Sequence, residues 1–401
     1  MSNLSASVAA QAPLRPFASF TANLSEGVVA AAQLLLPHLE RGGRIDAVIL
    51  RAAMERAFGG SDAAGTWDWK TAYDACEAAT VLFMRKFGLA IRTRAVSPAA
   101  ELSMLGKIAA LLPTHTRRSE ESQALQQFST PLALGFVAAS AAVITPADLV
   151  LEPSAGTGLL AIFAELAGSR LALNELAETR AALLGQLFPR AVTTRYDAAQ
   201  IHDHLDDAVR PSVVLMNPPF SVAAHVDGTV ADAALRHVVS ALARVAEGGR
   251  LVAITGASLS PDHPSWREAF VRLQERGRVV FSARVDGRVY ARHGTTAETR
   301  LTVIDRVPAD DPRSFPASPG MAPDVGTLLQ WVMSNVPSRL PVDGAAALPA
   351  PIHPVAVRPT RKPARQPLAV ASSSLERAGT ELAYETVDWK PAEGGSLTEA
   401  L

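Results

Sequence analysis

The chain has 401 residues, and its 38 Lys and Arg nearly balance its 39 Asp and Glu, which gives a formal net charge of −1. Because 48% of the residues are hydrophobic and only 19% are charged, the composition excludes a chain that is disordered overall. The length suits two or three domains. The near-neutral charge also excludes a uniformly basic nucleic-acid coat protein, so any contact with a polyanion must come from a local patch.

The cysteine count and the apolar runs indicate the compartment. Cys76 is the single cysteine, which excludes intramolecular disulfides and multi-cysteine zinc sites and favours a reducing cytoplasm. The longest apolar run, residues 132–144, has 13 residues and predicts a buried helix, since a membrane span needs about 20. The N-terminus lacks the basic start and apolar core of a secretory signal. We expect a cytoplasmic protein without membrane contact, and we assign no residue to a metal.

The N-terminal part of the chain has the pattern of packed helices. Between residues 23 and 110 the apolar positions recur at helical spacing, which predicts a helical domain over residues 1–120. Its third helix, residues 67–87, carries side chains on adjacent faces that we interpret as core, namely Tyr73, Cys76, Ala79 and Phe83.

The middle of the chain has the pattern of an α/β sheet. Seven short apolar runs begin at Leu149, Leu171, Val192, Val213, Leu251, Val279 and Leu301. Amphipathic stretches separate the first several runs, which predicts an open, doubly wound sheet over residues 121–306. Ligands bind such sheets beyond the carboxyl ends of the strands, so the residues just after each strand are the candidates for a site.

Prolines crowd the region that follows. We interpret residues 307–401 as a Pro-rich, linker-like region with one helix around residues 325–336. The region includes a dense basic cluster that either contacts phosphates or is ordinary solvated linker: Arg358, Arg361, Lys362 and Arg365. The last residues show no pattern that closes a domain, so we expect a fragment of something longer.

A glycine-containing turn follows the first predicted strand, with the sequence Glu-Pro-Ser-Ala-Gly-Thr-Gly over residues 152–158. Gly156 and Gly158 let the backbone approach a ligand, and Glu152 at the strand end can hold an ammonium group or a bridging water. The turn predicts a small-molecule pocket. A dinucleotide site stays open at this point, because Ala161 stands where that fingerprint has its third small residue.

Acidic residues follow the next two strands. Glu175 comes after the second strand, where a carboxylate can accept both hydroxyls of a ribose. Asp197 comes after the third strand and can accept a hydrogen bond from an adenine amino group. Either acid alone is typical of a solvated loop, but the pair on consecutive strands favours a nucleoside site along the carboxyl edge.

The fourth strand is followed by Asn217-Pro218-Pro219-Phe220. The prolines stiffen the turn, so that the Asn217 side-chain oxygen and the Pro218 carbonyl can both point at one amino group. An amine conjugated to a ring is a poor nucleophile because its lone pair is delocalised, and two acceptors on its hydrogens help to localise that pair. Phe220 can stack on the ring. The tetrapeptide therefore predicts catalysis at an exocyclic amine.

These motifs resemble those of class I S-adenosylmethionine-dependent methyltransferases. Residues 152–158 match the cofactor loop, and residues 217–220 match the (D/N)-P-P-(Y/F/W) motif of amino methyltransferases. The turn Phe-Ser-Thr-Pro at residues 128–131 is similar to the motif that opens the γ order of N6-adenine DNA methyltransferases, and a preceding helical domain is similar to type I modification subunits. The resemblance covers residues 126–306 and implies a Rossmann-like seven-stranded methyltransferase sheet with S-adenosylmethionine as cofactor.

The resemblance also implies roles for single residues. Phe128 and Thr130 would lie over the methionine part of the cofactor, while Glu175 matches the ribose acid and Asp197 the adenine contact. Ser154 departs from the first glycine of many relatives, a change that other members tolerate. The implied cofactor-binding set is Phe128, Thr130, Glu152, Ser154, Gly156, Gly158, Glu175 and Asp197.

A closer resemblance is to the N-terminal methylase part of bacterial methylase/helicase proteins of the strawberry notch type. It rests on residues 127–131, 151–158, 213–220 and 293–300. It implies a helicase domain in the same polypeptide as a partner, although the present residues contain no G-x-x-x-x-G-K-[ST] loop. Residues 293–300 either place His293, Thr295 or Arg300 near a substrate phosphate or form a hairpin connection.

Several acceptors fit this chemistry. The leading hypothesis is methyl transfer from S-adenosylmethionine to the N6 amino group of adenine in DNA, with the base flipped out of the helix. A protein glutamine poses the same lone-pair problem, but those relatives favour Tyr at the last motif position and lack the preceding Phe-Ser-Thr-Pro. RNA adenine is a third acceptor. A non-catalytic module that binds the cofactor or DNA beside a helicase is the remaining alternative.

Overall fold

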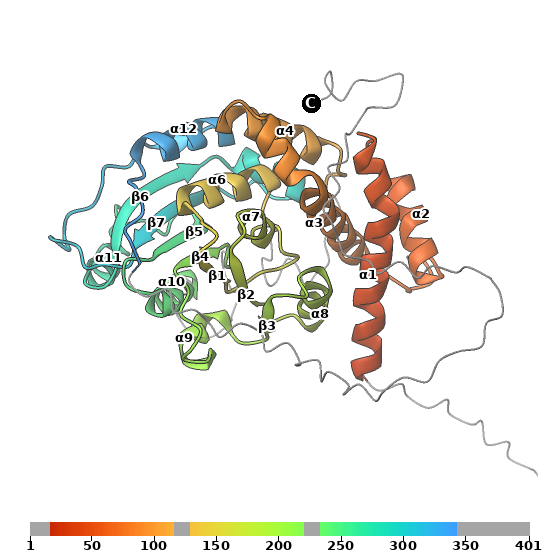
Figure 1. Ribbon diagram of the computed structural model, residues 1–401, viewed down its shortest axis with the longest axis horizontal. Helices are drawn as coiled ribbons and strands as arrows, with labels where there is room; N and C mark the ends of the chain where they lie inside the picture. Colours follow the sequence, from red (N-terminus) through yellow and green to blue (C-terminus); the bar gives the residue numbers. More distant parts are fainter. Residues whose placement is uncertain (1–16, 116–128, 220–232, 343–401) are drawn as a thin grey trace, which may run out of the picture.

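An eight-stranded sheet forms the centre of the molecule (Figure 1). The computed structural model describes residues 17–115, 129–219 and 233–342. The strands run in the order β3-β2-β1-β4-β5-β7-β6-β8. Their bounds are β1 (Leu149–Glu152), β2 (Arg170–Asn174), β3 (Val192–Thr194), β4 (Val213–Met216), β5 (Arg250–Gly256), β6 (Arg278–Val285), β7 (Thr299–Asp305) and β8 (Met321–Ala322).

The pairing of these strands is that of a Rossmann-like sheet. Strands β1 to β5 pair in parallel, β7 is antiparallel to both β5 and β6, and β8 pairs in parallel with β6. All seven predicted strands are present, so the predicted α/β class and seven-stranded sheet are confirmed. The short β8 adds an eighth strand at the edge, which the apolar pattern of the sequence did not indicate.

Helices cover both faces of the sheet. The alternation of side chains along β4 shows why, because Val213 and Leu215 join one apolar cluster while Val214 and Met216 join the other. On the first face lie α6 (Leu132–Ala142), α7 (Ala161–Leu166), α8 (Glu178–Leu187) and α12 (Val325–Asn335). On the second face lie α9 (Ile201–His204), α10 (Ala233–Arg244) and α11 (Arg267–Gln274).

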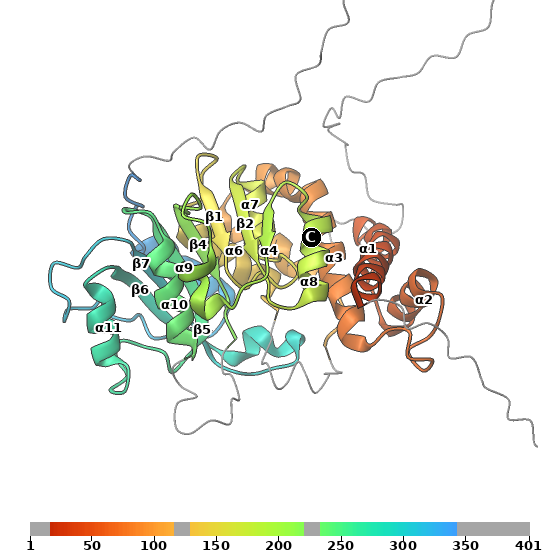
Figure 2. The same cartoon turned by 90° about the horizontal axis from the view of Figure 1, so that it is seen from below.

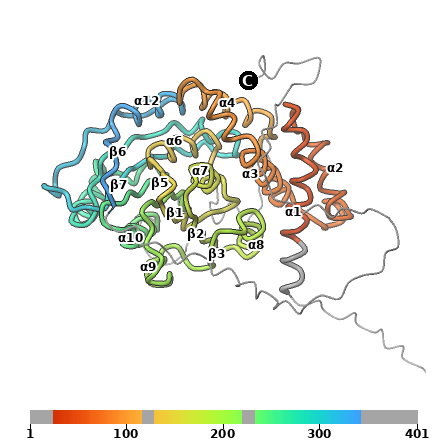
Figure 3. Tube along the Cα trace, in the orientation of Figure 1, coloured from red at the N-terminus to blue at the C-terminus, as the bar shows by residue number. Residues whose placement is uncertain are grey.

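The predicted buried helix is α6, which has apolar residues all around its circumference. It contacts β4 and β5 beneath it, and α12 and α4 (Pro98–Ala110) also pack against it, an arrangement that Figure 3 shows as a tube. A helix that is apolar on every side must be covered on every side. The sequence pattern and the packing of α6 therefore agree.

Three of the N-terminal helices lie at the end of the molecule near β3 (Figure 1), namely α1 (Phe17–Glu40), α2 (Ala47–Phe58) and α3 (Trp69–Arg94). The fourth, α4, packs instead on α6 and α12. Figures 1 and 2 both place α1 and α2 at the end of the molecule opposite α11. Helix α3 contacts α7 and α8, and its Arg85 makes two hydrogen bonds of 2.7 and 2.8 Å to Glu165 on α7. This helical region is thus joined to the sheet by polar as well as apolar contacts.

Part of the Pro-rich region also packs on the sheet. Strand β8 pairs with β6, and α12 covers α6. The buried guanidinium of Arg250 donates to Asp305 at 2.6 and 3.1 Å, to the Ala141 carbonyl at 3.1 Å and to the Pro337 carbonyl at 3.0 Å. The basic cluster of residues 358–365 lies outside the described residues. The division of the chain at residues 120 and 306 stays a prediction.

Among the described helices, none combines the length and the apolar character that a membrane span requires.

Candidate active site

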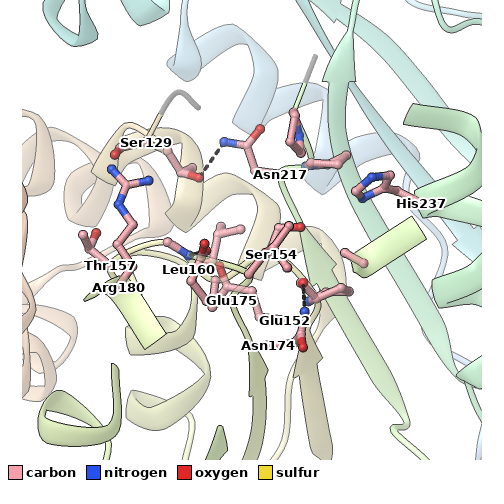
Figure 4. A pocket seen from close by; sticks show the side chains of 18 of the residues that line it. Ser129, Glu152, Ser154, Thr157, Leu160, Asn174, Glu175, Arg180, Asn217 and His237 are labelled. Carbon is pink, nitrogen blue, oxygen red and sulfur yellow. Dashed lines mark hydrogen bonds between the residues drawn. The ribbon is translucent and has the colours of Figure 1, made fainter. Parts of the chain in front are cut away.

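A cavity of about 320 Å³ opens at the carboxyl ends of β1, β2 and β4. Figure 4 shows the side chains that line it. The structure brings nine predicted residues together there: Thr130, Glu152, Ser154, Gly156, Glu175, Asp197, Asn217, Pro218 and Pro219. Gly158 is buried and does not line the cavity, while Phe128 and Phe220 lie outside the described residues. The topology therefore assembles the predicted site from segments that are far apart in the chain.

The two glycines of the 152–158 turn are required for different reasons. Both have positive φ, 55° for Gly156 and 89° for Gly158, which is a backbone conformation that side chains disfavour. A Cβ atom added at Gly156 would meet no atom within 4 Å, whereas one added at Gly158 would collide with the ring of Phe188. Gly156 thus exposes its backbone to the cavity, and Gly158 allows the turn to pack on the helix layer.

Glu175 fixes this turn from the neighbouring strand. Its Oε2 accepts a hydrogen bond from the Gly156 backbone N–H at 2.8 Å, and its Oε1 accepts from the Ala177 N–H at 2.9 Å. The side chain is buried and lines the cavity. Each carboxylate oxygen has two lone pairs, so Glu175 retains the capacity to accept from a ligand hydroxyl.

Asn174 is a structural residue of the site to which the sequence analysis gave no role. Its Nδ2 donates to the carbonyls of Pro153 at 2.8 Å and Tyr196 at 2.9 Å. Its Oδ1 accepts from Thr194 Oγ1 at 2.9 Å and from the Tyr196 N–H at 2.8 Å. One fully buried amide therefore joins the carboxyl ends of β1, β2 and β3.

Glu152 is a buried carboxyl group at the end of β1. Burial raises the pKa of Glu152 well above its usual range, a backbone hydrogen bond with Ala161 acts in the opposite direction, and the charge of Glu175 raises the pKa further. Within the described residues, the buried Oε2 atom of Glu152 has no hydrogen-bond partner. A buried oxygen that lacks a partner is costly, so a cationic group bound in the cavity would stabilise the ionised form.

Asp197 lies at the open side of the cavity. It is exposed, and its Oδ1 accepts from the Ala199 N–H at 2.9 Å, which starts the short 3₁₀ helix η1 (Ala198–Gln200). Tyr196 beside it stacks on His204 with ring centroids 5.2 Å apart. A second oxygen of Asp197 is therefore available on the lining.

Asn217 is held in one orientation by side chains from two other parts of the chain. Its Nδ2 donates to the buried Thr130 Oγ1 at 2.9 Å, the bond drawn in Figure 4. Burial raises the pKa of the Tyr290 hydroxyl well above its usual range, and a hydrogen bond with the Asn217 side chain acts in the opposite direction. Because the amide nitrogen is committed to Thr130, the amide plane at the end of β4 is fixed.

Two buried residues near the site, Tyr290 and His237, carry no signal in the sequence. Tyr290 is fully buried after β6, and His237 on α10 lines the cavity with a pKa that burial lowers. No local spacing marks either residue, so the fold was needed to place them. Arg300, which one interpretation put near a substrate phosphate, instead donates to Ser282 Oγ at 2.9 Å and to the Ala257 carbonyl at 3.2 Å within the sheet.

Comparison with known proteins gives structural likenesses only. The sequence matches no protein-family model and no curated protein. Among solved structures, a protein proposed to be a class I S-adenosylmethionine-dependent methyltransferase from Listeria monocytogenes is 12% identical, with a TM-score of 0.44, over 80% of this chain and 99% of that one. A modification subunit of a proposed type I restriction enzyme from Vibrio vulnificus is 17% identical, with a TM-score of 0.38, over 53% of this chain and 49% of that one.

A third likeness is to TrmN from Thermus thermophilus, at 18% identity and a TM-score of 0.34, over 47% of this chain. The match spans 52% of TrmN, so the chain covers about half the length of that protein and of the Vibrio subunit. At these identities and TM-scores, each likeness concerns the arrangement of the sheet and its helices.

Proposed function

We propose that the chain is an S-adenosylmethionine-dependent methyltransferase that acts on the N6 amino group of adenine in DNA, with the base flipped out of the helix. The observation that carries the proposal is the position of Asn217. Its oriented amide stands at the carboxyl end of β4 and lines the same cavity as Glu152, Gly156 and Glu175. The residues proposed to bind the cofactor and the amide proposed to bind the target amino group therefore line the same cavity.

Glu152, Glu175 and Asp197, with the turn at Gly156, form the acidic half of the cavity, and these residues fit this cofactor. S-adenosylmethionine carries an ammonium group, two ribose hydroxyls and an adenine ring. Glu152 offers a buried oxygen that lacks a partner within the described residues, and the open space above Gly156 allows the backbone to approach a ligand. Glu175 and Asp197 offer further acceptors along the same edge. A cavity of about 320 Å³ lies within the range of small-molecule sites.

When bound, S-adenosylmethionine supplies an electrophilic methyl group on a positively charged sulfur. The Asn217 oxygen and the Pro218 carbonyl accept hydrogen bonds from the target amino group and direct its lone pair. Thr130 keeps the amide from rotating, because it accepts from Asn217 Nδ2 at 2.9 Å. The acceptors should bind more strongly as the amine becomes positive, so their effect appears in the rate.

The acceptor class is tested by label transfer. The full chain is incubated with tritiated S-adenosylmethionine and, side by side, with duplex DNA, RNA of the same sequence and a mixed protein substrate. We expect label on adenine N6 in DNA, and labelling slower by on the order of 100-fold or more with the Asn217→Ala variant. Label on RNA or on a glutamine would contradict the DNA assignment. A chain that binds the cofactor and labels none of the three would overturn methyl transfer.

Contact with DNA must come from local patches, because the chain is nearly neutral. We propose that the helical N-terminal region and the basic cluster at residues 358–365 are those patches. Phe220 would stack on the flipped base. A helicase domain of the same polypeptide would be the partner, in the cytoplasm. Removal of residues 343–401 tests the cluster. We expect weaker DNA binding and a shallower salt dependence, whereas an unchanged salt slope would leave the cluster as linker.

A further inference from the structure

Three side chains with metal-ligating atoms lie together next to the cofactor turn. Glu77 belongs to α3, His115 follows α4, and His293 ends the 3₁₀ helix η3 (Gly287–His293). Their ligand atoms, one carboxylate oxygen and two imidazole nitrogens, all lie within 4.8 Å of one another. Segments that are distant in the chain thus bring two histidines and one carboxylate to a single point.

Both imidazole rings are held in place by their surroundings. The ring of His115 stacks on Tyr73 with centroids 4.1 Å apart and an angle of 16° between the planes. The ring of His293 meets that of His115 edge-on at 5.1 Å. The His115 backbone N–H donates to the Arg292 carbonyl at 2.8 Å, which joins the two histidine-bearing segments. Side chains that are positioned in advance lose little freedom when they bind an ion.

His293 offers a buried nitrogen atom. Its Nδ1 atom is buried and has no hydrogen-bond partner within the part of the chain that the structure describes. A metal ion would satisfy the buried nitrogen.

Glu77 offers carboxyl oxygens. Burial and the charge of Asp74 raise the pKa of Glu77, and a cation bound beside it would favour the ionised form. The residue is buried, and its Oε2 accepts a hydrogen bond from Thr157 Oγ1 of the cofactor turn at 2.7 Å. Arg180, whose charge also acts on Glu77, is already paired with Asp74 at 2.7 Å. A carboxylate has more lone pairs than a hydroxyl donor occupies, so Glu77 can bind a cation and keep its bond to Thr157.

We propose that Glu77, His115 and His293 bind a divalent transition metal ion, and that the ion is zinc. Two imidazoles and a carboxylate suit transition metals, whereas magnesium and calcium prefer oxygen ligands throughout. Zinc accepts three such protein ligands and takes water at its fourth position. Zinc–nitrogen bonds of about 2.0–2.1 Å place tetrahedral ligand atoms roughly 3.3 Å apart, so ligand atoms that lie within 4.8 Å of one another would have to close by up to about 1.5 Å.

The ion would join three parts of the chain around the turn that holds Gly156. Through Glu77 and Thr157 it would steady the turn from α3, and through His293 it would steady the segment that carries Tyr290. This role is structural, and the proposal is independent of the proposed methyl transfer because its test needs neither cofactor nor substrate.

The test is a zinc titration of the full chain. Protein stripped with a chelator and dialysed is titrated with zinc chloride in competition with a chromophoric chelator, and its melting temperature is recorded with and without the ion. We expect one zinc ion per chain with submicromolar affinity and a higher melting temperature when the ion is bound. Cobalt(II) in place of zinc should give the visible absorption of a site with nitrogen and oxygen ligands.

Variants locate the site. His115→Ala and His293→Ala should each weaken zinc binding by roughly 100-fold, and Glu77→Gln by roughly tenfold or more. His202→Ala is the matched control, because His202 is an exposed histidine on α9 and its loss should leave the affinity unchanged. Circular dichroism of each metal-free variant separates loss of the ligand from loss of the fold.

Two outcomes would overturn the proposal. In the first, the folded wild-type chain takes up less than one zinc ion at ten micromolar free metal. In the second, the folded His115→Ala and His293→Ala variants bind zinc as tightly as the wild-type chain, which would place the ion elsewhere.

Discussion

The acidic half of the cavity and its amide half, which consists of Asn217 and Thr130, are held in place by different kinds of bond. In the acidic half, Glu175 accepts from two nearby backbone N–H groups, and Asn174 bonds the ends of adjacent strands. In the amide half, Asn217 depends on Thr130 and Tyr290, side chains that reach it from distant segments. The first half is therefore built into the sheet, whereas the second is assembled only when the whole fold is complete.

The largest effect is expected from the amide half. Asn217→Ala removes the acceptor that grips the target amine, and we expect turnover to fall on the order of 100-fold or more while cofactor affinity stays within a few-fold. Single-turnover methylation and calorimetric titration measure the two quantities. Asn335→Ala, which removes an exposed amide on α12, is the control. An undiminished single-turnover rate would end the catalytic assignment.

The acidic half should show the reverse pattern. Glu175→Ala removes a charged acceptor and frees the Gly156 N–H, so we expect cofactor binding to weaken by about 1.5–3 kcal/mol, or roughly 10–150-fold. The rate at saturating cofactor should change far less. Calorimetric titration gives the affinity, with Glu178→Ala at an exposed position of α8 as the control. Equal losses of cofactor affinity in Glu175→Ala and Glu178→Ala would contradict the proposed contact between Glu175 and the cofactor.

Cofactor affinity should depend on pH because of Glu152. Its pKa is raised in the cofactor-free protein, and the carboxylate is the form that accepts from an ammonium group, so affinity should fall as pH is lowered through that pKa, by up to about tenfold per pH unit. Affinity of the Glu152→Gln variant should not depend on pH in this way. Titrations at several pH values test this, and parallel pH profiles would contradict it.

The raised pKa of Glu152 also predicts that the wild-type chain and Glu152→Gln differ in thermal stability when no cofactor is present. The folded state binds the Glu152 proton more tightly than the unfolded state does, so this group stabilises the fold least at high pH. As pH rises above about 4.5, the melting temperature of the wild-type chain should fall relative to that of Glu152→Gln. A constant difference between the two would show that the carboxyl group titrates normally.

The smallest effect is expected at Thr130. Thr130→Val keeps the size of the side chain but removes the acceptor of Asn217 Nδ2, so the amide can rotate. A hydrogen bond of about 0.5–1.5 kcal/mol corresponds to a rate loss of roughly 2–12-fold. The control is Thr93→Val, at an exposed position of α3. A loss in cofactor affinity without a loss in rate would assign Thr130 to the acidic half instead.

The sequence predicted the acidic half more completely than the amide half. Strand ends followed by Glu152, Glu175 and Asp197 are local patterns, and the structure places all three on one cavity. The Asn217 motif is also a local pattern. The side chains that hold Asn217 in place are not local, because Tyr290 becomes a neighbour of Asn217 only when the chain returns to the sheet after β6. Contacts of that kind leave no periodic signal in the chain.

The same reasoning explains the errors at the edges of the fold. Strand β8 has two residues, and a run that short has no alternation to detect. Arg250 also contacts this region by donating to the Pro337 carbonyl, and its role as a buried donor is not visible in its own strand. The spacing of Glu77, His115 and His293 in the sequence matches no metal motif, so their proximity becomes visible only in the fold.

The four-way bonding of Arg250 has a consequence for synthesis of the protein. Its hydrogen bond to the Pro337 carbonyl can form only when that residue has been translated, nearly 190 residues after the start of β1. At about 5–20 residues per second, that interval is roughly 10–40 s. During it, α6 lacks its α12 cover and exposes apolar surface to the ribosome exit and to chaperones. Fast elongation over residues 250–337 should therefore favour soluble expression.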